Sequence, residues 1–84
     1  METIANQIFK PHKVEKIHFE NKYMTLVVDG QQITVNLETV SPLLASAPDS
    51  KRQDYEVSPA GYGIHWIQLD EDLSINSLLQ VADY

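Results

Sequence analysis

Hydrophobic and polar residues alternate on both sides of the dipeptide Asp29-Gly30. The apolar positions are Met24, Leu26 and Val28 before the dipeptide and Ile33, Val35 and Leu37 after it. Asp-Gly is typical of a two-residue type I′ turn, because both central positions of that turn need a positive φ. The pattern therefore predicts a β-hairpin whose apolar side chains share one face. Its predicted cross-strand pairs are Val28–Gln31, Leu26–Ile33 and Met24–Val35.

Residues 14–20 precede this hairpin and fit the same register. A two-residue turn at Asn21-Lys22 gives the pairs Glu20–Tyr23, Phe19–Met24 and Ile17–Leu26. Both turns bring the apolar side chains to one face, so the sequence predicts a three-strand antiparallel meander. The opposite face is mixed, and we expect it to be solvated or to form half of an interface. That face carries Lys16, His18, Glu20, Tyr23, Thr25, Val27, Gln32, Thr34 and Asn36.

A short helix is predicted to follow the meander. Ser41-Pro42 is typical of a helix start, with serine as the N-cap and proline at the first helical position. Pro48 ends this helix, because proline breaks the run of backbone hydrogen bonds. We expect the polar residues 49–53 to form a loop.

Two further strands are predicted after that loop. Apolar and polar residues alternate around Tyr55 and Val57 and again over residues 62–67. The sequence between them, residues 59–61, is Pro-Ala-Gly and predicts a turn. The alternation directs Ile64 and Trp66 of the second of these strands toward the interior.

A second helix is predicted to end the chain, with Asp72 or Ser74 as its N-cap. Its apolar residues follow the i, i+3, i+4, i+7 spacing of a helix face. These residues are Ile75, Leu78, Leu79 and Ala82. The predicted element order is therefore β-β-β-α-β-β-α, an α+β fold in which helices cover one face of an antiparallel sheet.

The chain has 84 residues, 43% of them hydrophobic and 21% charged, which predicts one folded domain. Residues 1–12 have weak patterning, so we expect an N-terminal arm there and a single domain over residues 13–84. The chain has no cysteine, which excludes disulfides and thiolate sites. No apolar run approaches the roughly 20 residues of a membrane span, and no signal-peptide block is present, so a cytoplasmic protein is expected.

The net charge is -6, from 12 acidic and 6 basic residues, and this sign argues against a nucleic-acid binder. Every Lys and Arg lies in residues 1–52, where acidic residues balance them, so the net charge arises in residues 53–84. The acidic residues there are Asp54, Glu56, Asp70, Glu71, Asp72 and Asp83. A basic group near the N-terminus is interleaved with glutamates, and we interpret it as a solvated strand edge. That group comprises Lys10, His12, Lys13, Lys16 and His18.

The run from Gly63 to Ser74, followed by Leu78-Leu79, resembles the C-terminal signature of the DUF2442 family, small bacterial proteins of unknown function. That signature has a Trp-Pro pair, then Asp-Glu-Asp-Leu-Ser, and Ile67 stands where the family usually has the proline. The resemblance covers about residues 13–80 and implies an α+β fold. It implies no catalytic activity, since none is established for the family. It also implies a partner, because members are often encoded beside a small basic protein of the DUF4160 family in pairs that look like toxin–antitoxin modules.

The most conspicuous polar cluster is Asp70-Glu71-Asp72. One interpretation is a set of carboxylates at the N-terminus of the last helix, where the helix dipole favours negative charge. A patch that engages a basic partner and a metal site are the alternatives. The cluster lacks the Asp-x-Asp-x-Asp-Gly pattern of a calcium loop.

His65 and Trp66 are the other candidates in this region. We interpret His65 as a strand residue that points away from Trp66 and is exposed or hydrogen-bonded. A contact between His65 and Asp70 would be an acid/base or pH-sensitive pair. Trp66 is the only tryptophan, and it is expected to pack in the core or to anchor an interface.

These observations predict a non-enzymatic interaction module, the antitoxin-like acidic partner of a small basic, DUF4160-like protein. The predicted partner surface comprises Trp66, Asp70, Glu71, Asp72 and His65. No catalytic residue, cofactor, metal, nucleic acid or membrane is predicted. A homo-oligomeric structural or regulatory domain, formed through the mixed face of the meander, is the alternative. A small metal-dependent hydrolase that uses His65 with Asp70 or Asp72 is a remote one.

Overall fold

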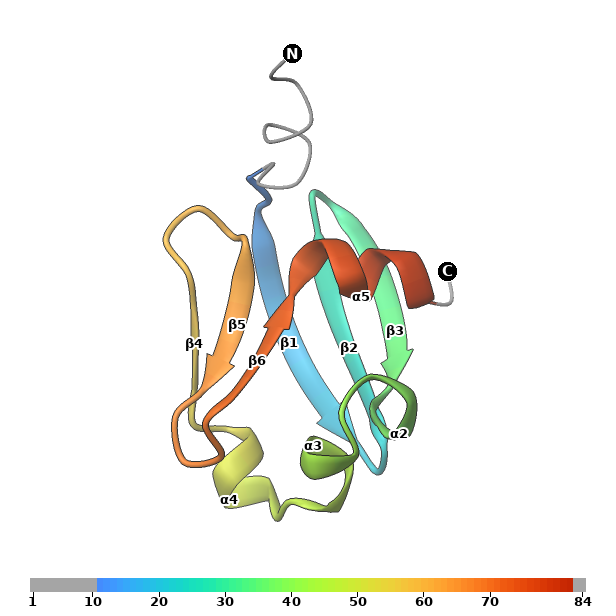
Figure 1. Ribbon diagram of the computed structural model, residues 1–84. Helices are drawn as coiled ribbons and strands as arrows, with labels where there is room; N and C mark the ends of the chain where they lie inside the picture. Colours follow the sequence, from blue (N-terminus) through green and yellow to red (C-terminus); the bar gives the residue numbers. More distant parts are fainter. Residues whose placement is uncertain (1–10, 83–84) are drawn as a thin grey trace.

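Two three-stranded antiparallel sheets form the framework of this protein in a computed structural model that describes residues 11–82 (Figure 1). The first sheet contains β1 (Val14–Glu20), β2 (Tyr23–Val28) and β3 (Gln31–Asn36), and the second contains β4 (Tyr55–Val57), β5 (Gly63–Trp66) and β6 (Glu71–Ser74). The helices are α2 (Leu37–Val40), α3 (Pro42–Ser46), α4 (Asp49–Arg52) and α5 (Ile75–Val81). The predicted α+β class and the order β-β-β-α-β-β-α are confirmed, with two further short helices before β4 and one further strand, β6, before the last helix.

The predicted hairpin between β2 and β3 is confirmed in its turn and in its register. Asp29 and Gly30 both have positive φ angles, 53° and 86°, as a type I′ turn requires. The predicted pairs Val28–Gln31, Leu26–Ile33 and Met24–Val35 are all present. Their apolar side chains alternate with polar ones and form one wall of the core.

The strand β1 pairs with β2 as predicted near their turn but contains a bulge farther along. The pairs Glu20–Tyr23 and Phe19–Met24 are confirmed. Beyond His18 the register shifts by one residue, so that Glu15 lies opposite Val27. Lys16, within this irregularity, has a φ of 54°. The predicted pair Ile17–Leu26 falls inside the bulge, because an extra residue on β1 breaks the regular pairing there.

The segment between the sheets consists of three short helices, and side chains cap the N-termini of α2 and α3. Ser41 is the N-cap of α3, and its Oγ accepts a hydrogen bond from the Leu44 backbone N–H at 3.2 Å, as predicted. The predicted loop over residues 49–53 is wrong, since α4 occupies most of it. The helix forms here because its last residue, Arg52, is buried and bonds to backbone carbonyls outside the helix. The Arg52 side chain donates to the carbonyls of Leu44 (3.0 Å), Ala45 (2.8 Å) and Asn21 (2.6 Å).

The core lies between the two sheets and α5, which crosses the inner side of the first sheet (Figure 1). Trp66 on β5 is fully buried in it, and its indole Nε1 donates to the Arg52 carbonyl at 2.9 Å. The rings of Phe19 and Tyr55 pack against Trp66 at centroid distances of 6.5 and 6.1 Å. The other buried apolar residues are Met24, Leu26, Val28, Ile33, Val35, Leu37, Leu44, Ala45, Ile64, Ile75 and Leu78.

The region before the last helix differs from the prediction. Glu71–Ser74 forms the strand β6, so the carboxylates of Asp70-Glu71-Asp72 do not lie in the first turn of a helix. Asp70 has a φ of 50° in the turn that reverses the chain between β5 and β6. The helix α5 begins only at Ile75, and its N-cap is Ser74 rather than Asp72.

His12, assigned from the sequence to an N-terminal arm, belongs to the folded domain. Its side chain is only 5% exposed, and its ring contacts Asp29 (2.7 Å) and Asn76 (3.0 Å). Its backbone N–H donates to the Ala60 carbonyl at 2.9 Å. The rest of the expected arm, residues 1–10, lies outside the described residues.

Candidate functional site

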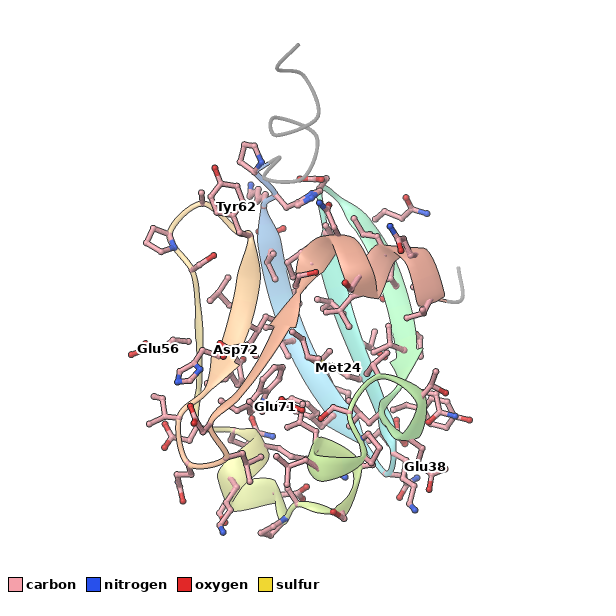
Figure 2. The ribbon with its side chains drawn as sticks, in the orientation of Figure 1. Met24, Glu38, Glu56, Tyr62, Glu71 and Asp72 are labelled. Atoms are coloured by element: carbon pink, nitrogen blue, oxygen red, sulfur yellow. The ribbon has the colours of Figure 1, made fainter. Side chains whose placement is uncertain are left out.

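A groove with a volume of about 720 Å³ lies along the second sheet, and we call it the outer groove. Strands β4, β5 and β6 provide its floor, the turn between β4 and β5 closes one side, and α5 provides a polar rim. The residues that line it are Glu56, Val57, Ser58, Pro59, Tyr62, Gly63, Ile64, His65, Asp72, Leu73, Ser74, Asn76, Ser77 and Gln80. Figure 2 shows Glu56, Tyr62 and Asp72 on this side of the molecule.

One residue from each strand forms a row across the outer groove. Glu56 on β4 lies opposite His65 on β5, and His65 lies opposite Asp72 on β6. Because side chains alternate along a strand, these three project to the face opposite Trp66. The row therefore places a histidine between two carboxylates on one surface.

The histidine of this row bonds to only one of its two neighbours. The distance from His65 Nδ1 to Asp72 Oδ1 is 2.8 Å, with the side chains 40% and 75% exposed. The Asp72 carboxylate accepts hydrogen bonds, so the imidazole donates through Nδ1 and its orientation is fixed. Within residues 11–82, neither His65 Nε2 nor the exposed Glu56 carboxylate has a hydrogen-bond partner, so both are open to a ligand.

The three consecutive acids of the sequence point in three directions. Asp70 is exposed in the β5–β6 turn, and Asp72 projects into the outer groove. Glu71 faces the opposite way, where its Oε2 accepts a hydrogen bond from the hydroxyl of Ser41. Figure 2 shows Glu71 nearer the centre of the molecule than Glu56. The cluster is therefore no single patch, because strand alternation separates its members.

Of the five residues predicted for a partner surface, the structure brings together two in the outer groove, His65 and Asp72. Trp66 packs in the core, one of the two roles expected for it, and is not part of a partner surface, since it is fully buried and its N–H is satisfied internally. The histidine pairs with Asp72 rather than with Asp70, because the β5–β6 register sets them opposite each other.

Glu56 and Tyr62 also line the outer groove, and no motif in the sequence marks them as site residues. The alternation of Glu56 with Tyr55 and Val57 signals that it faces outward. Its position beside His65, however, depends on the length of the turn that joins β4 to β5. Tyr62 ends that turn and is one of the exposed large hydrophobic residues.

The position of this turn is set by hydrogen bonds and by two glycines. Ser58 Oγ accepts from the backbone N–H groups of Tyr62 (2.8 Å) and Gly63 (3.1 Å). Gly61 has a φ of +69°, and a Cβ there would lie 1.8 Å from the His12 carbonyl oxygen. At Gly63 a Cβ would lie 3.0 Å from the Leu73 carbonyl oxygen. Gly61 therefore needs glycine, and a side chain at Gly63 would be in tight contact with the backbone of β6, so the wall of the outer groove is built by close backbone packing.

The comparison with protein families fits this architecture. A family model described as a protein of unknown function, DUF2442, matches residues 14–83. The chain belongs to the DUF2442 family. Neither the curated proteins nor the solved structures contain a match to this DUF2442 chain.

The outer groove of this DUF2442 domain is acidic and lacks a compensating base. Glu56 and Asp72 line it, whereas none of its lining residues is Lys or Arg. Across residues 11–82, no group of at least three His, Cys, Asp or Glu side chains is arranged to hold a metal ion. No helix in that same part of the chain is long and apolar enough to cross a membrane. The arrangement is suited to binding cationic side chains.

Proposed function

We propose that this DUF2442 protein is a non-enzymatic interaction module that binds a basic partner protein in its outer groove. The observation that carries the proposal is the Glu56–His65–Asp72 row in a groove without Lys or Arg. The proposed partner is a small basic, DUF4160-like protein, and the proposed role is that of an antitoxin-like acidic half of the pair.

The distribution of charge supports a partner at this sheet. On the first sheet and its helices, lysines lie beside carboxylates, as in Lys22–Glu38 (2.6 Å) and Lys13–Glu15 (3.9 Å). Residues 53–84 contain no Lys or Arg. Among the described acids of this part, Glu56, Glu71 and Asp72 lie on the strands of the second sheet. Negative charge there would speed the encounter with a basic protein and disfavour acidic ones.

The composition of the outer groove suits Lys and Arg side chains in particular. The carboxylates of Glu56 and Asp72 would accept charge-assisted hydrogen bonds from a cationic head group. Tyr62 at the rim is 41% exposed and adds an apolar surface for the stem of such a side chain. Ser77 and Gln80 on α5 add polar groups along the opposite rim.

The surroundings of the His65 imidazole also favour a binding role over a catalytic one. In a hydrolase with a serine nucleophile, the ring nitrogen distal to the carboxylate contacts a hydroxyl group. The His65–Asp72 pair has the orienting carboxylate, but no hydroxyl lies within hydrogen-bond distance of Nε2 among the described residues. We therefore assign His65 to binding rather than to acid/base catalysis.

Copurification with the small basic protein encoded beside this one tests whether a complex forms. The matched variants Glu56→Lys and Glu20→Lys test whether it forms at the outer groove. Both replace an exposed strand glutamate by lysine, but Glu20 lies on β1 away from the outer groove. We expect Glu56→Lys to weaken the complex at least tenfold and Glu20→Lys to weaken it less than threefold. The measurement is calorimetric titration at low and at moderate salt.

Two results would contradict the proposal. One is the absence of any complex with the basic neighbour at low salt. The other is an equal loss of affinity in both variants, which would indicate a general charge effect rather than binding in the outer groove.

A further inference from the structure

The two sheets have four edge strands, and three of them carry features that prevent pairing with another strand. The edge of β1 is interrupted by the bulge at Lys16. The strand β6 is short and charged, with Glu71 and Asp72. The strand β4 is shorter still and carries Glu56, and Pro59 follows it closely. Charges, bulges, prolines and short length are the usual means by which proteins protect sheet edges.

The fourth edge, β3, has none of these features. Its sequence, Gln-Gln-Ile-Thr-Val-Asn, contains no charged residue and no proline. Its six residues pair with β2 in an unbroken register. It is the longest uninterrupted and uncharged edge in the part of the chain that the structure describes.

Three backbone N–H groups on β3 point away from its own sheet. Ladder hydrogen bonds in an antiparallel pair join alternate residues. The bond from Leu37 N–H to the Lys22 carbonyl (2.8 Å) shows which residues of β3 bond to β2 and which point outward. Ile33 and Val35 therefore bond to β2. Gln32, Thr34 and Asn36 point outward, and their N–H groups have no partner within residues 11–82. The edge is thus ready to accept another strand.

We infer that β3 is a dimerisation edge, where a second copy of this chain pairs antiparallel about a two-fold axis at Thr34. This register places Thr34 opposite its own copy and Gln32 opposite Asn36, so all three outward-facing residues lie in hydrogen-bonded pairs. Ile33 then faces Val35 of the other copy on the inner side. The two first sheets become one six-stranded sheet with an isologous interface.

Charge favours a second copy over a basic protein as the occupant of this edge. Each copy has a net charge of -6, so two copies repel except where they meet through neutral surface. β3 is neutral, and the Lys22–Glu38 ion pair beside its end is internally balanced. A basic partner would find no carboxylate along this strand. The last turn of α5 reaches past β3, and Val81 there is 49% exposed, which adds apolar surface beside the edge (Figure 1).

Dimerisation at β3 is independent of binding in the outer groove. Figure 1 shows β3 and β4 on opposite sides of the molecule. A dimer joined through β3 therefore leaves both outer grooves free, and either proposal stands if the other fails.

The absence of cysteine allows a direct test of the register by disulfide trapping. In a hydrogen-bonded antiparallel pair the facing Cα atoms lie about 5.5 Å apart, within the range that a disulfide spans. We expect Thr34→Cys to form a covalent dimer under mild oxidation with copper phenanthroline. The matched control is Gln32→Cys on the same strand and face, whose two copies would lie about 14 Å apart.

The oligomeric state provides a second readout that needs no oxidation. We expect wild-type chain to sediment at twice the 9.5 kDa monomer mass, and Thr34→Lys, which sets two lysines face to face, to sediment as a monomer. Thr25→Lys makes the same change on the central strand β2 and should remain a dimer. A wild-type monomer at all concentrations, or equal cross-linking of Thr34→Cys and Gln32→Cys, would overturn the inference.

Discussion

At the scale of single residues, the fold depends on polar side chains that satisfy buried backbone groups. The Arg52 side chain donates to three carbonyls from two places in the chain, and the Arg52 carbonyl accepts from the Trp66 indole N–H. Among the described residues, no buried side-chain nitrogen or oxygen lacks a partner. A buried guanidinium contributes here because its five N–H groups form a fixed fork that matches several acceptors at once.

Replacing Arg52 by leucine should therefore destabilise the protein, although leucine is hydrophobic. The change removes the Arg52 donor from the Leu44, Ala45 and Asn21 carbonyls, and of these Leu44 still accepts from the Ala47 backbone N–H. We expect a loss of about 2–4 kcal/mol in the free energy of unfolding. Urea denaturation followed by circular dichroism measures it. The neighbouring variant Lys51→Leu is the control and should change stability by less than about 0.5 kcal/mol. Equal stability of both variants would show that the Arg52 hydrogen bonds contribute nothing.

Gly61 provides a second test at this scale. Its φ of +69° and the 1.8 Å approach of a Cβ to the His12 carbonyl oxygen mean that alanine fits neither the backbone nor the space. We expect Gly61→Ala to cost at least about 2 kcal/mol, and more than Gly30→Ala, where no atom lies within 4 Å. Thermal denaturation of both variants checks the order. A larger loss for Gly30→Ala would contradict the proposed role of close packing.

At the scale of elements, the sequence predicted individual strands and helix starts better than it predicted how separate elements pair with one another. Asp29-Gly30 and the alternation around it define both strands of one hairpin, and Ser41-Pro42 defines the start of α3. These signals succeed because the turn, the cap and the apolar face are set by neighbouring residues. The strand β6 was not predicted, since the short Glu71–Ser74 segment forms only when the β5–β6 turn brings it against β5. For the same reason the sequence left both Asp70 and Asp72 open as partners of His65, and the register pairs it with Asp72.

Ser41 connects two elements through one hydroxyl group. It accepts from the Leu44 N–H as the cap of α3 and donates to the Glu71 carboxylate of β6. We expect Ser41→Ala to cost about 1–3 kcal/mol, from the lost cap and from a half-buried carboxylate left without its donor. Chemical denaturation measures this loss. Ser46→Ala, at the exposed end of the same helix, should change stability little. A similar loss in Ser41→Ala and Ser46→Ala would contradict the role of the Ser41 hydroxyl in joining α3 to β6.

At the scale of the whole molecule, His12 connects the segment before β1 to the β2–β3 turn, to the β4–β5 turn and to α5. Its ring reaches Asp29 in the β2–β3 turn and Asn76 in α5, while its backbone bonds to Ala60 before β5. The sequence placed this histidine in a solvated basic group, because no local pattern reveals contacts 17 and 64 residues away. The outer groove likewise depends on contacts between residues far apart in the sequence, since its row takes one residue from each of three strands.

We expect His12→Ala to lower the free energy of unfolding by about 1–3 kcal/mol, because two polar partners lose their contacts and a cavity forms. The exposed His18 on β1 provides the control, and His18→Ala should change stability by less than about 0.5 kcal/mol. Hydrogen exchange of the amides in the β2–β3 turn and the first turn of α5 would locate the loss. Faster exchange at only one of the two sites would contradict the tie between them.

The burial of the single tryptophan has a practical consequence for spectroscopy. Trp66 is enclosed by Phe19 and Tyr55 and bonded to the Arg52 carbonyl, on the face of β5 opposite to the outer groove. Its emission therefore reports whether the core is intact, whereas a ligand in the outer groove lies next to Tyr62 instead. Fluorescence excited in the indole band can thus follow unfolding while a partner is titrated, and the two processes can be separated in one sample.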